Sequence, residues 1–153
     1  MIELRGWGME ASEDKLIQLL LDDIKSTSRQ VYFGMDGAFI CFSDGRFLER
    51  ANSLPPAIDQ LRYPFPNALS ADAIRKMIPQ DIGKSGEIPG SIEEDGKQYK
   101  ILCKKFTCVV ASVCYGYLKM RYPKTLIYCL GRNKPVVFFQ GEIVRAVLMP
   151  IRT

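Results

Sequence analysis

The sequence predicts a single α+β domain whose antiparallel sheets carry two helices on one face. Two stretches place apolar residues at helical spacing, and short alternating stretches separated by Asp-Gly or Gly turns are typical of antiparallel strands. The order strand, helix, three strands occurs twice along the 153 residues, which predicts two similar units. This length is that of one domain able to bury its own core.

The first unit covers residues 1–51, and residues 1–9 are expected to form its first strand. Ser12 is the predicted N-cap of a helix that runs to about Lys25, with acidic residues following the cap at the positive end of the helix dipole. Three strands should follow over 30–35, 38–43 and 46–50. Asp36-Gly37 and Asp44-Gly45 separate them, and the first is predicted to form a type I′ turn.

Residues 52–86 interrupt this pattern with five prolines. Proline restricts both its own backbone and that of the residue before it, so regular structure is expected to be sparse. The one predicted helix is Ser70–Met77, with Ser70 as its cap. The segment is interpreted as an insertion or crossover between the two units.

The second unit covers residues 87–153, and opens with predicted strands over 87–93 and 97–102 around Asp95-Gly96. Residues 103–119 are predicted to form a helix because apolar side chains recur at helical spacing. Strands over 125–130, 135–140 and 142–149 are expected to complete the unit.

Composition argues against an enzyme. The chain has no histidine, which removes the commonest general base, and its adjacent acidic pairs, Asp22-Asp23 and Glu93-Glu94, cannot converge on one atom. Its five cysteines lack C-x-x-C spacing, so neither a metal site nor a disulfide framework is predicted. We expect no cofactor, no metal and no membrane association, and we expect a cytoplasmic location with free thiols. The net charge of +4 is compatible with a polyanionic partner without requiring one.

The C-terminal stretch is the most informative segment. An apolar strand runs into Met149-Pro150-Ile151-Arg152, and proline cannot donate a backbone N–H to a neighbouring strand. The chain is therefore predicted to leave the sheet at Met149 and to expose apolar residues. Exposed apolar residues often mark interaction sites, and the alternative is that the stretch finishes in the protein's own core.

These features resemble a single domain of the bacterial DNA polymerase III β sliding clamp, most closely its C-terminal third. The resemblance rests on Val147-Leu148-Met149-Pro150-Ile151-Arg152, which is similar to the family's Met-Pro-X-Arg ending, and on residues 86–101 before the second helix. It covers about the last 65 residues. A clamp subunit has three such domains, whereas this chain has one, and residues 52–86 have no counterpart.

The resemblance implies a DNA-clamp-like domain of two β-α-β-β-β units that acts, without catalysis, in DNA replication. Its role would be that of a processivity-type ring around duplex DNA, built as a homo-oligomer, or of a docking platform for replication proteins with short apolar motifs. The implied partner-binding residues are Val147, Met149, Pro150, Ile151 and Arg152. The implied DNA-facing residues are Lys104, Lys105, Lys119, Arg121 and Lys124. The alternative is that these residues form an ordinary solvated charged face with no role in DNA binding. The alternative function is that of a small monomeric interaction protein, of phage or mobile-element origin, that mimics or inhibits a host factor.

Overall fold

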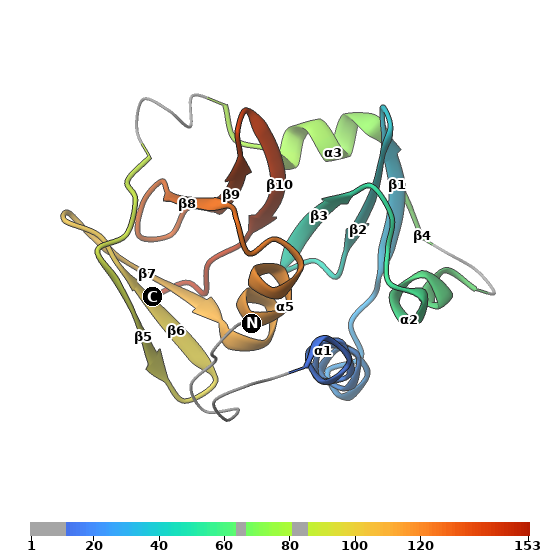
Figure 1. Cartoon of the computed structure of the whole chain (residues 1–153), viewed down its shortest axis with the longest axis horizontal. Helices are drawn as coiled ribbons and strands as arrows, with labels where there is room; N and C mark the ends of the chain where they lie inside the picture. The colour runs from blue at the N-terminus through green and yellow to red at the C-terminus, as the bar shows by residue number, and fades with distance from the viewer. Residues whose placement is uncertain (1–11, 64–66, 81–85) are drawn as a thin grey trace.

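A seven-stranded sheet organises the computed structural model, which describes residues 12–63, 67–80 and 86–153 (Figure 1). The strand order is β4-β1-β2-β3-β10-β9-β8. All neighbours are antiparallel except β1 and β4, which are parallel. The strands are β1 (Tyr32–Asp36), β2 (Phe39–Ser43), β3 (Phe47–Ala51), β4 (Asn67–Leu69), β8 (Leu126–Cys129), β9 (Val136–Gln140) and β10 (Ile143–Leu148).

A second, antiparallel sheet of three strands stands beside the first and appears at the left of Figure 1. Its strands, in spatial order, are β5 (Ser91–Asp95), β6 (Gln98–Leu102) and β7 (Thr107–Ala111). Tyr115 joins the two sheets, because its ring centroid lies 5.2 Å from that of Tyr99 in the small sheet and 6.0 Å from that of Phe138 in the large one. Such aromatic pairs add to the stabilisation gained from burial alone.

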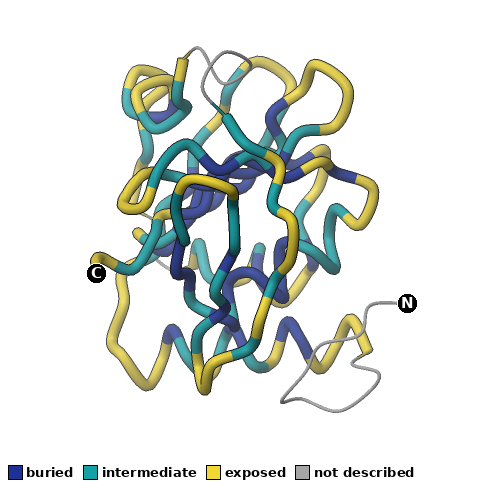
Figure 2. Tube along the Cα trace, turned by 90° about the vertical axis from the view of Figure 1, so that its left-hand side faces the viewer, coloured by how far each residue is buried: buried dark blue, intermediate teal, exposed yellow. Residues whose placement is uncertain are grey.

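Helices α1 (Glu13–Ser26) and α5 (Ser112–Arg121) pack on one face of the large sheet, together with the short α2 (Pro56–Asp59). The 3-10 turn η1 (Gln60–Arg62) follows α2 directly, and α3 (Ala71–Met77) covers the opposite face of the sheet. The predicted α+β class is therefore confirmed. Figure 2 shows the buried segments gathered in the interior and the exposed turns at the periphery.

The repeated part of the chain is a helix followed by three strands. α1-β1-β2-β3 and α5-β8-β9-β10 have this order, and their last strands pair antiparallel at the centre of the sheet. The seam between β3 and β10 consists of the pairs Phe47↔Leu148, Leu48↔Val147 and Glu49↔Ala146. The predicted strand over residues 1–9 lies outside the described residues.

The helix predicted over residues 103–119 is wrong in its first half. Cys103 begins a turn, in which its N–H donates to Phe106 O at 3.0 Å, residues 107–111 form β7, and the helix begins only at Ser112. β7 contains a Thr, two adjacent Val residues and a Cys, and β-branched residues favour strands. A short strand buried on both faces shows the same run of apolar residues as a buried helix, so spacing alone did not separate them.

One turn, one strand boundary and the proline-rich segment also differ from expectation. The first hairpin turn is formed by Gly37 and Ala38, and Gly37 alone of the two has positive φ (59°), which is the pattern of a type II′ turn rather than type I′. The predicted strand over 87–93 begins only at Ser91. Within residues 52–86, α2, η1 and β4 were not predicted, whereas the Ser70 cap is confirmed, since its hydroxyl accepts from Ala73 N at 3.1 Å.

Candidate binding surface

The stretch after β10 crosses from the large sheet to the small one. Met149 N–H donates to Arg46 O at 2.7 Å, and Ile151 N–H donates to Val109 O at 2.7 Å. Pro150 lies between these two anchors and has no N–H to donate. The segment therefore runs along the outer edge of β7.

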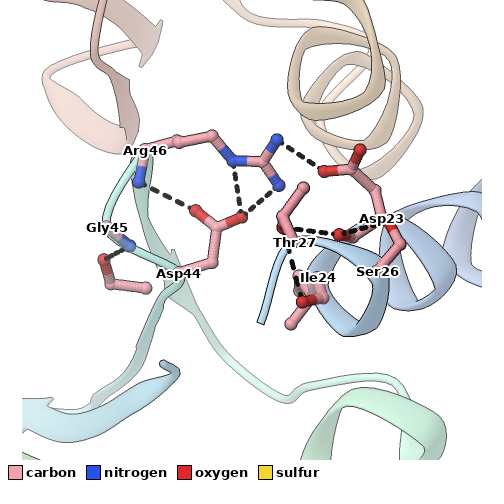
Figure 3. A network of polar contacts seen from close by, with 8 residues as sticks. Asp23, Ile24, Ser26, Thr27, Asp44, Gly45 and Arg46 are labelled. Carbon is pink, nitrogen blue, oxygen red and sulfur yellow. Dashed lines mark hydrogen bonds and ion pairs between the residues drawn. The ribbon is translucent and has the colours of Figure 1, made fainter. Parts of the chain in front are cut away.

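The first anchor is itself fixed by a partly buried ion-pair network (Figure 3). The Arg46 guanidinium binds Asp44, which is 2% exposed, at 2.6 Å and Asp23 of α1 at 2.6 Å. The Arg46 N–H also donates to Asp44 Oδ1 at 2.9 Å. Asp22 points elsewhere and accepts from Gln18 Nε2 at 2.7 Å, so the adjacent Asp22-Asp23 pair does not converge on one site.

A loop of the large sheet holds the end of the segment. Thr153 N–H donates to Asn133 Oδ1 at 3.1 Å, and Arg132 Nε donates to Thr153 Oγ1 at 3.0 Å. The same loop contacts β7, because Cys108 Sγ donates weakly to Gly131 O at 3.4 Å. We call the surface formed by the β6–β7 turn (103–106), the β8–β9 loop (130–135) and the C-terminal segment (149–153) the tail surface.

The tail surface is strongly basic. Its three segments contain no Asp or Glu, and each of their cationic side chains is exposed. None of these side chains forms an ion pair with any residue that the structure describes. The cations are Lys104, Lys105, Arg132, Lys134 and Arg152. Glu87, half-buried and bridged to Cys129, is an acid close to this surface.

A pocket of about 440 Å³ lies between the tail surface and β7. Two of its lining side chains are cationic and come from different segments, Lys105 from the β6–β7 turn and Arg132 from the β8–β9 loop. The remaining lining residues are Phe106, Thr107, Val109 and Thr153. The pocket thus combines an apolar wall with positive charge.

The outer edge of β7 borders this pocket. Cys103 N–H donates to Phe106 O, and Ser112 N–H donates to Lys97 O. Because hydrogen bonding alternates along an antiparallel pair, the main-chain groups of Thr107 and Val109 point away from β6. The Val109 carbonyl is taken by Ile151, whereas Thr107 has no backbone partner on this edge among the described residues.

The predicted partner-binding residues do not share one environment. Met149 is 40% exposed and Arg152 is exposed, whereas Pro150 and Ile151 are half-buried. Val147 is 1% exposed and packs in the core between β3 and β9. Of the five residues, Met149 and Arg152 are exposed at the tail surface, and the half-buried Pro150 and Ile151 keep part of their surface accessible to a partner.

The predicted DNA-facing residues divide into two groups. Lys104 and Lys105 lie in the β6–β7 turn, while Lys119 and Arg121 lie in the last turn of α5 and Lys124 lies just beyond it. Figure 1 shows the β6–β7 turn at the left-hand tip of the small sheet, away from the end of α5. Burial lowers the pKa of Lys119, whose Nζ donates to Thr125 O at 3.4 Å.

The two long helices do not present a basic face. α5 is mostly buried between the sheets, and Cys114, Tyr115, Gly116, Tyr117 and Leu118 are buried. The exposed charges of α1 are Glu13, Asp14 and Asp22 against Lys15 and Lys25, three negative and two positive, so that its outer face carries a net charge of −1. A phosphate backbone would gain little from either helix.

Sequence reasoning did not select Arg132 and Lys134 as binding residues. Their signal was present as a Gly-Arg-Asn-Lys-Pro loop between two predicted strands. What the sequence lacked was the information that this loop lies against β7 and the C-terminal segment, which is a tertiary contact.

No protein-family model matches the chain, and comparison with curated proteins and with solved structures gave no match either. The resemblance to the sliding clamp therefore remains a prediction from the sequence. None of the described helices is long and apolar enough to cross a membrane. Within residues 12–63, 67–80 and 86–153, no group of three or more Cys, Asp or Glu side chains is arranged to hold a metal ion.

Proposed function

We propose that this chain is a non-enzymatic docking module that binds an extended peptide segment of a protein partner on the tail surface. The peptide would combine acidic with apolar side chains. The observation that carries this proposal is the meeting of three basic segments without Asp or Glu around a pocket with an apolar wall. Complementary charge steers a partner to such a site and sets its orientation.

The edge of β7 supports an extended peptide in particular. Thr107 offers outward-facing main-chain groups next to the point where Ile151 pairs with Val109. A peptide strand added there would continue the edge that the C-terminal segment has begun to cover. This is the recognition mode in which main-chain hydrogen bonds supply affinity and side-chain pockets supply selectivity.

Replication proteins with short apolar motifs, which the resemblance implies as partners, fit the apolar part of the tail surface. Met149, Ile151 and Phe106 would contact the apolar side chains, and Lys105 and Arg132 would pair with acidic ones. A ring around duplex DNA has less support from this geometry, because α5 is buried and the outer face of α1 is slightly acidic. We also place the protein in a reducing compartment such as the cytoplasm, since its five thiols are free.

A random peptide library displayed on phage and selected on the full chain tests the docking proposal. We expect enrichment of peptides in which Asp or Glu neighbours Leu, Ile or Phe. In a ¹⁵N-labelled sample, the selected peptide should shift the amide signal of Thr107. The double variant Lys105→Glu/Arg132→Glu should weaken binding at least about tenfold, because two charge-assisted contacts become repulsive.

The double variant Lys105→Arg/Arg132→Lys keeps both positive charges, so as the matched control it should retain binding within about threefold. Equal loss in both double variants, or peptide-induced shifts confined to residues away from β7, would contradict docking at this surface.

A further inference from the structure

A second pocket lies on a different part of the molecule, where the ends of β3, α5 and β9 meet the start of β10. Its volume is about 220 Å³. We call it the arginine pocket, and its lining residues are Asn52, Ser53, Arg121, Tyr122, Gln140 and Arg145. All six are polar, two are guanidinium groups, and none is a carboxylate.

Arg121 is held rigidly in this pocket. Its Nε donates to Glu49 Oε2 at 2.9 Å, and its Nη2 donates to Ser53 O at 2.6 Å. Glu49 is fully buried and also accepts from the hydroxyls of Tyr117 at 2.6 Å and Tyr122 at 2.7 Å. Burial alone would lower the pKa of Arg121, but the Glu49 carboxylate raises it above its ordinary value, so the guanidinium stays charged.

Three donors bind the Glu49 carboxylate, one at Oε1 and two at Oε2. Burial, followed by the neighbouring Glu49 charge, raises the pKa of Tyr117 and of Tyr122, so both tyrosines remain protonated donors. Glu49 thus fixes the position of Arg121 from inside the protein, while Arg121 Nη1 has no hydrogen bond within the part of the chain that is described. The arrangement presents a preorganised cation to the pocket.

Arg145 reaches the same pocket from β10. Its Nε donates to Gln140 Oε1 at 2.9 Å, and its guanidinium carbon lies 5.4 Å from the centroid of the Phe39 ring. Neither terminal nitrogen of Arg145 has a hydrogen bond or an ion pair with a described residue. Glu142, in the β9–β10 turn, is exposed but does not line the pocket.

We infer that the arginine pocket binds a phosphate group. Two guanidinium groups from separate elements, with an Asn, a Ser and a Gln around them, provide the donors that a tetrahedral oxyanion needs. Glu49, the one carboxylate among the described residues that pairs with Arg121, is buried and already paired, so it does not repel an anion as a free carboxylate would. The volume is below the roughly 300–1,000 Å³ of drug-sized sites, which suits a phosphate group with only part of the molecule that carries it.

The phosphate could belong to a small phosphate ester or to a nucleic-acid backbone, and two titrations distinguish these sources. The first adds inorganic phosphate to the ¹⁵N-labelled protein at constant ionic strength and follows the Nε–H signals of Arg121 and Arg145. The second adds a short duplex DNA. We expect saturable shifts of both arginines with inorganic phosphate, and a tighter response to DNA only if a backbone phosphate is the natural ligand.

Arg145→Gln is the decisive variant, because the half-buried Arg145 makes no contact with Glu49 and its loss leaves the buried Glu49 pairs intact. It should weaken phosphate binding at least about tenfold, since one of the two guanidinium groups is lost. Lys124→Gln removes the same charge from an exposed residue nearby that does not line the pocket, and should change the affinity less than about twofold.

Two results would overturn the assignment. One is the absence of saturable arginine shifts with phosphate in the unmodified protein. The other is an equal loss of phosphate affinity in Arg145→Gln and Lys124→Gln, which would mean that phosphate binding depends on the net charge of the protein alone. Neither result bears on the tail surface, which is tested by peptide binding.

Discussion

At the scale of single residues, the cysteines behave as buried apolar side chains. Cys41, Cys108, Cys114 and Cys129 are each 0% exposed, and Cys103 is half-buried. Burial raises the pKa of Cys41 and of Cys108 to about 11, and the negative charge of Asp36 adds to the effect at Cys41. Since the reactive form of a cysteine is the thiolate, these thiols should be inert in the folded protein.

This burial predicts a loss of stability in alkaline solution. The folded state holds Cys41 and Cys108 neutral up to about pH 11, whereas the unfolded chain ionises them near pH 9.0. Their contribution is complete below pH 9 and is lost as the pH rises through 11. The free energy of unfolding should fall above pH 9 by up to about 1.4 kcal/mol per pH unit for each thiol.

Urea unfolding at a series of pH values from 7 to 11 measures this fall. Cys41→Ala/Cys108→Ala should show a shallower slope above pH 9 than the unmodified chain, after correction for its lower stability at neutral pH. Identical slopes would show that groups other than these two thiols cause the loss of stability above pH 9.

At the scale of elements, the sequence predicted the helix caps correctly, because a few neighbouring residues determine the geometry of a cap. Ser12 caps α1 by accepting from Lys15 N at 3.2 Å, and Ser70 caps α3 in the same way. Such a cap involves residues only two or three positions apart, so the sequence contains what is needed. β7 differs, because its identity as a strand depends on pairing with β6.

The tail surface likewise depends on tertiary contacts that the sequence pattern does not reveal. Met149-Pro150 predicted correctly where the chain leaves the sheet, since the lack of an N–H in proline is a property of the residue. The contacts of Thr153 with the β8–β9 loop, and of Ile151 with β7, join residues 20 and 42 positions apart. The basic cluster exists only after these contacts form, so periodicity could not reveal it.

The edge formed by β1 and β4 depends on one glycine. A Cβ at Gly34 would lie 2.1 Å from Leu69 O and 3.2 Å from Ile74 Cδ1 of α3. Gly34→Ala should therefore separate β4 and α3 from the sheet and lower the free energy of unfolding by about 1–3 kcal/mol, as overpacking usually does. Urea unfolding measures the loss, and amide exchange should show weakened protection in β1.

Gly90→Ala is the matched control, because its Cβ would have Leu102 O at 3.8 Å as its nearest neighbour. That is an ordinary contact, and the change should cost less than about 0.5 kcal/mol. Similar losses for the two variants would mean that β4 does not need the close approach at Gly34.

At the scale of the whole molecule, the sheet ends in short edge strands. β4 has three residues and β8 has four, and short edges offer little main chain for pairing with another copy. We therefore expect a monomer. Light scattering on a sizing column should give a mass near 17.3 kDa.

A mass near six times that value would instead favour the DNA-encircling ring, since about six one-domain chains would be needed to close one. In that case the edge strands would be the first place to look for the contact between copies. A monomer leaves peptide docking as the function to pursue.

The central seam has a consequence for synthesis of the protein. β3 ends at Ala51, and its partner β10 begins at Ile143, so the ribosome must add more than ninety residues before the two can pair. At about 5–20 residues per second, this takes roughly 5–20 seconds. During that interval the nascent chain carries Phe47 and Leu48, both fully buried in the finished fold, on a strand with one side open. The first half of this protein is thus exposed to chaperones and to premature association on every round of translation, whatever the finished molecule binds.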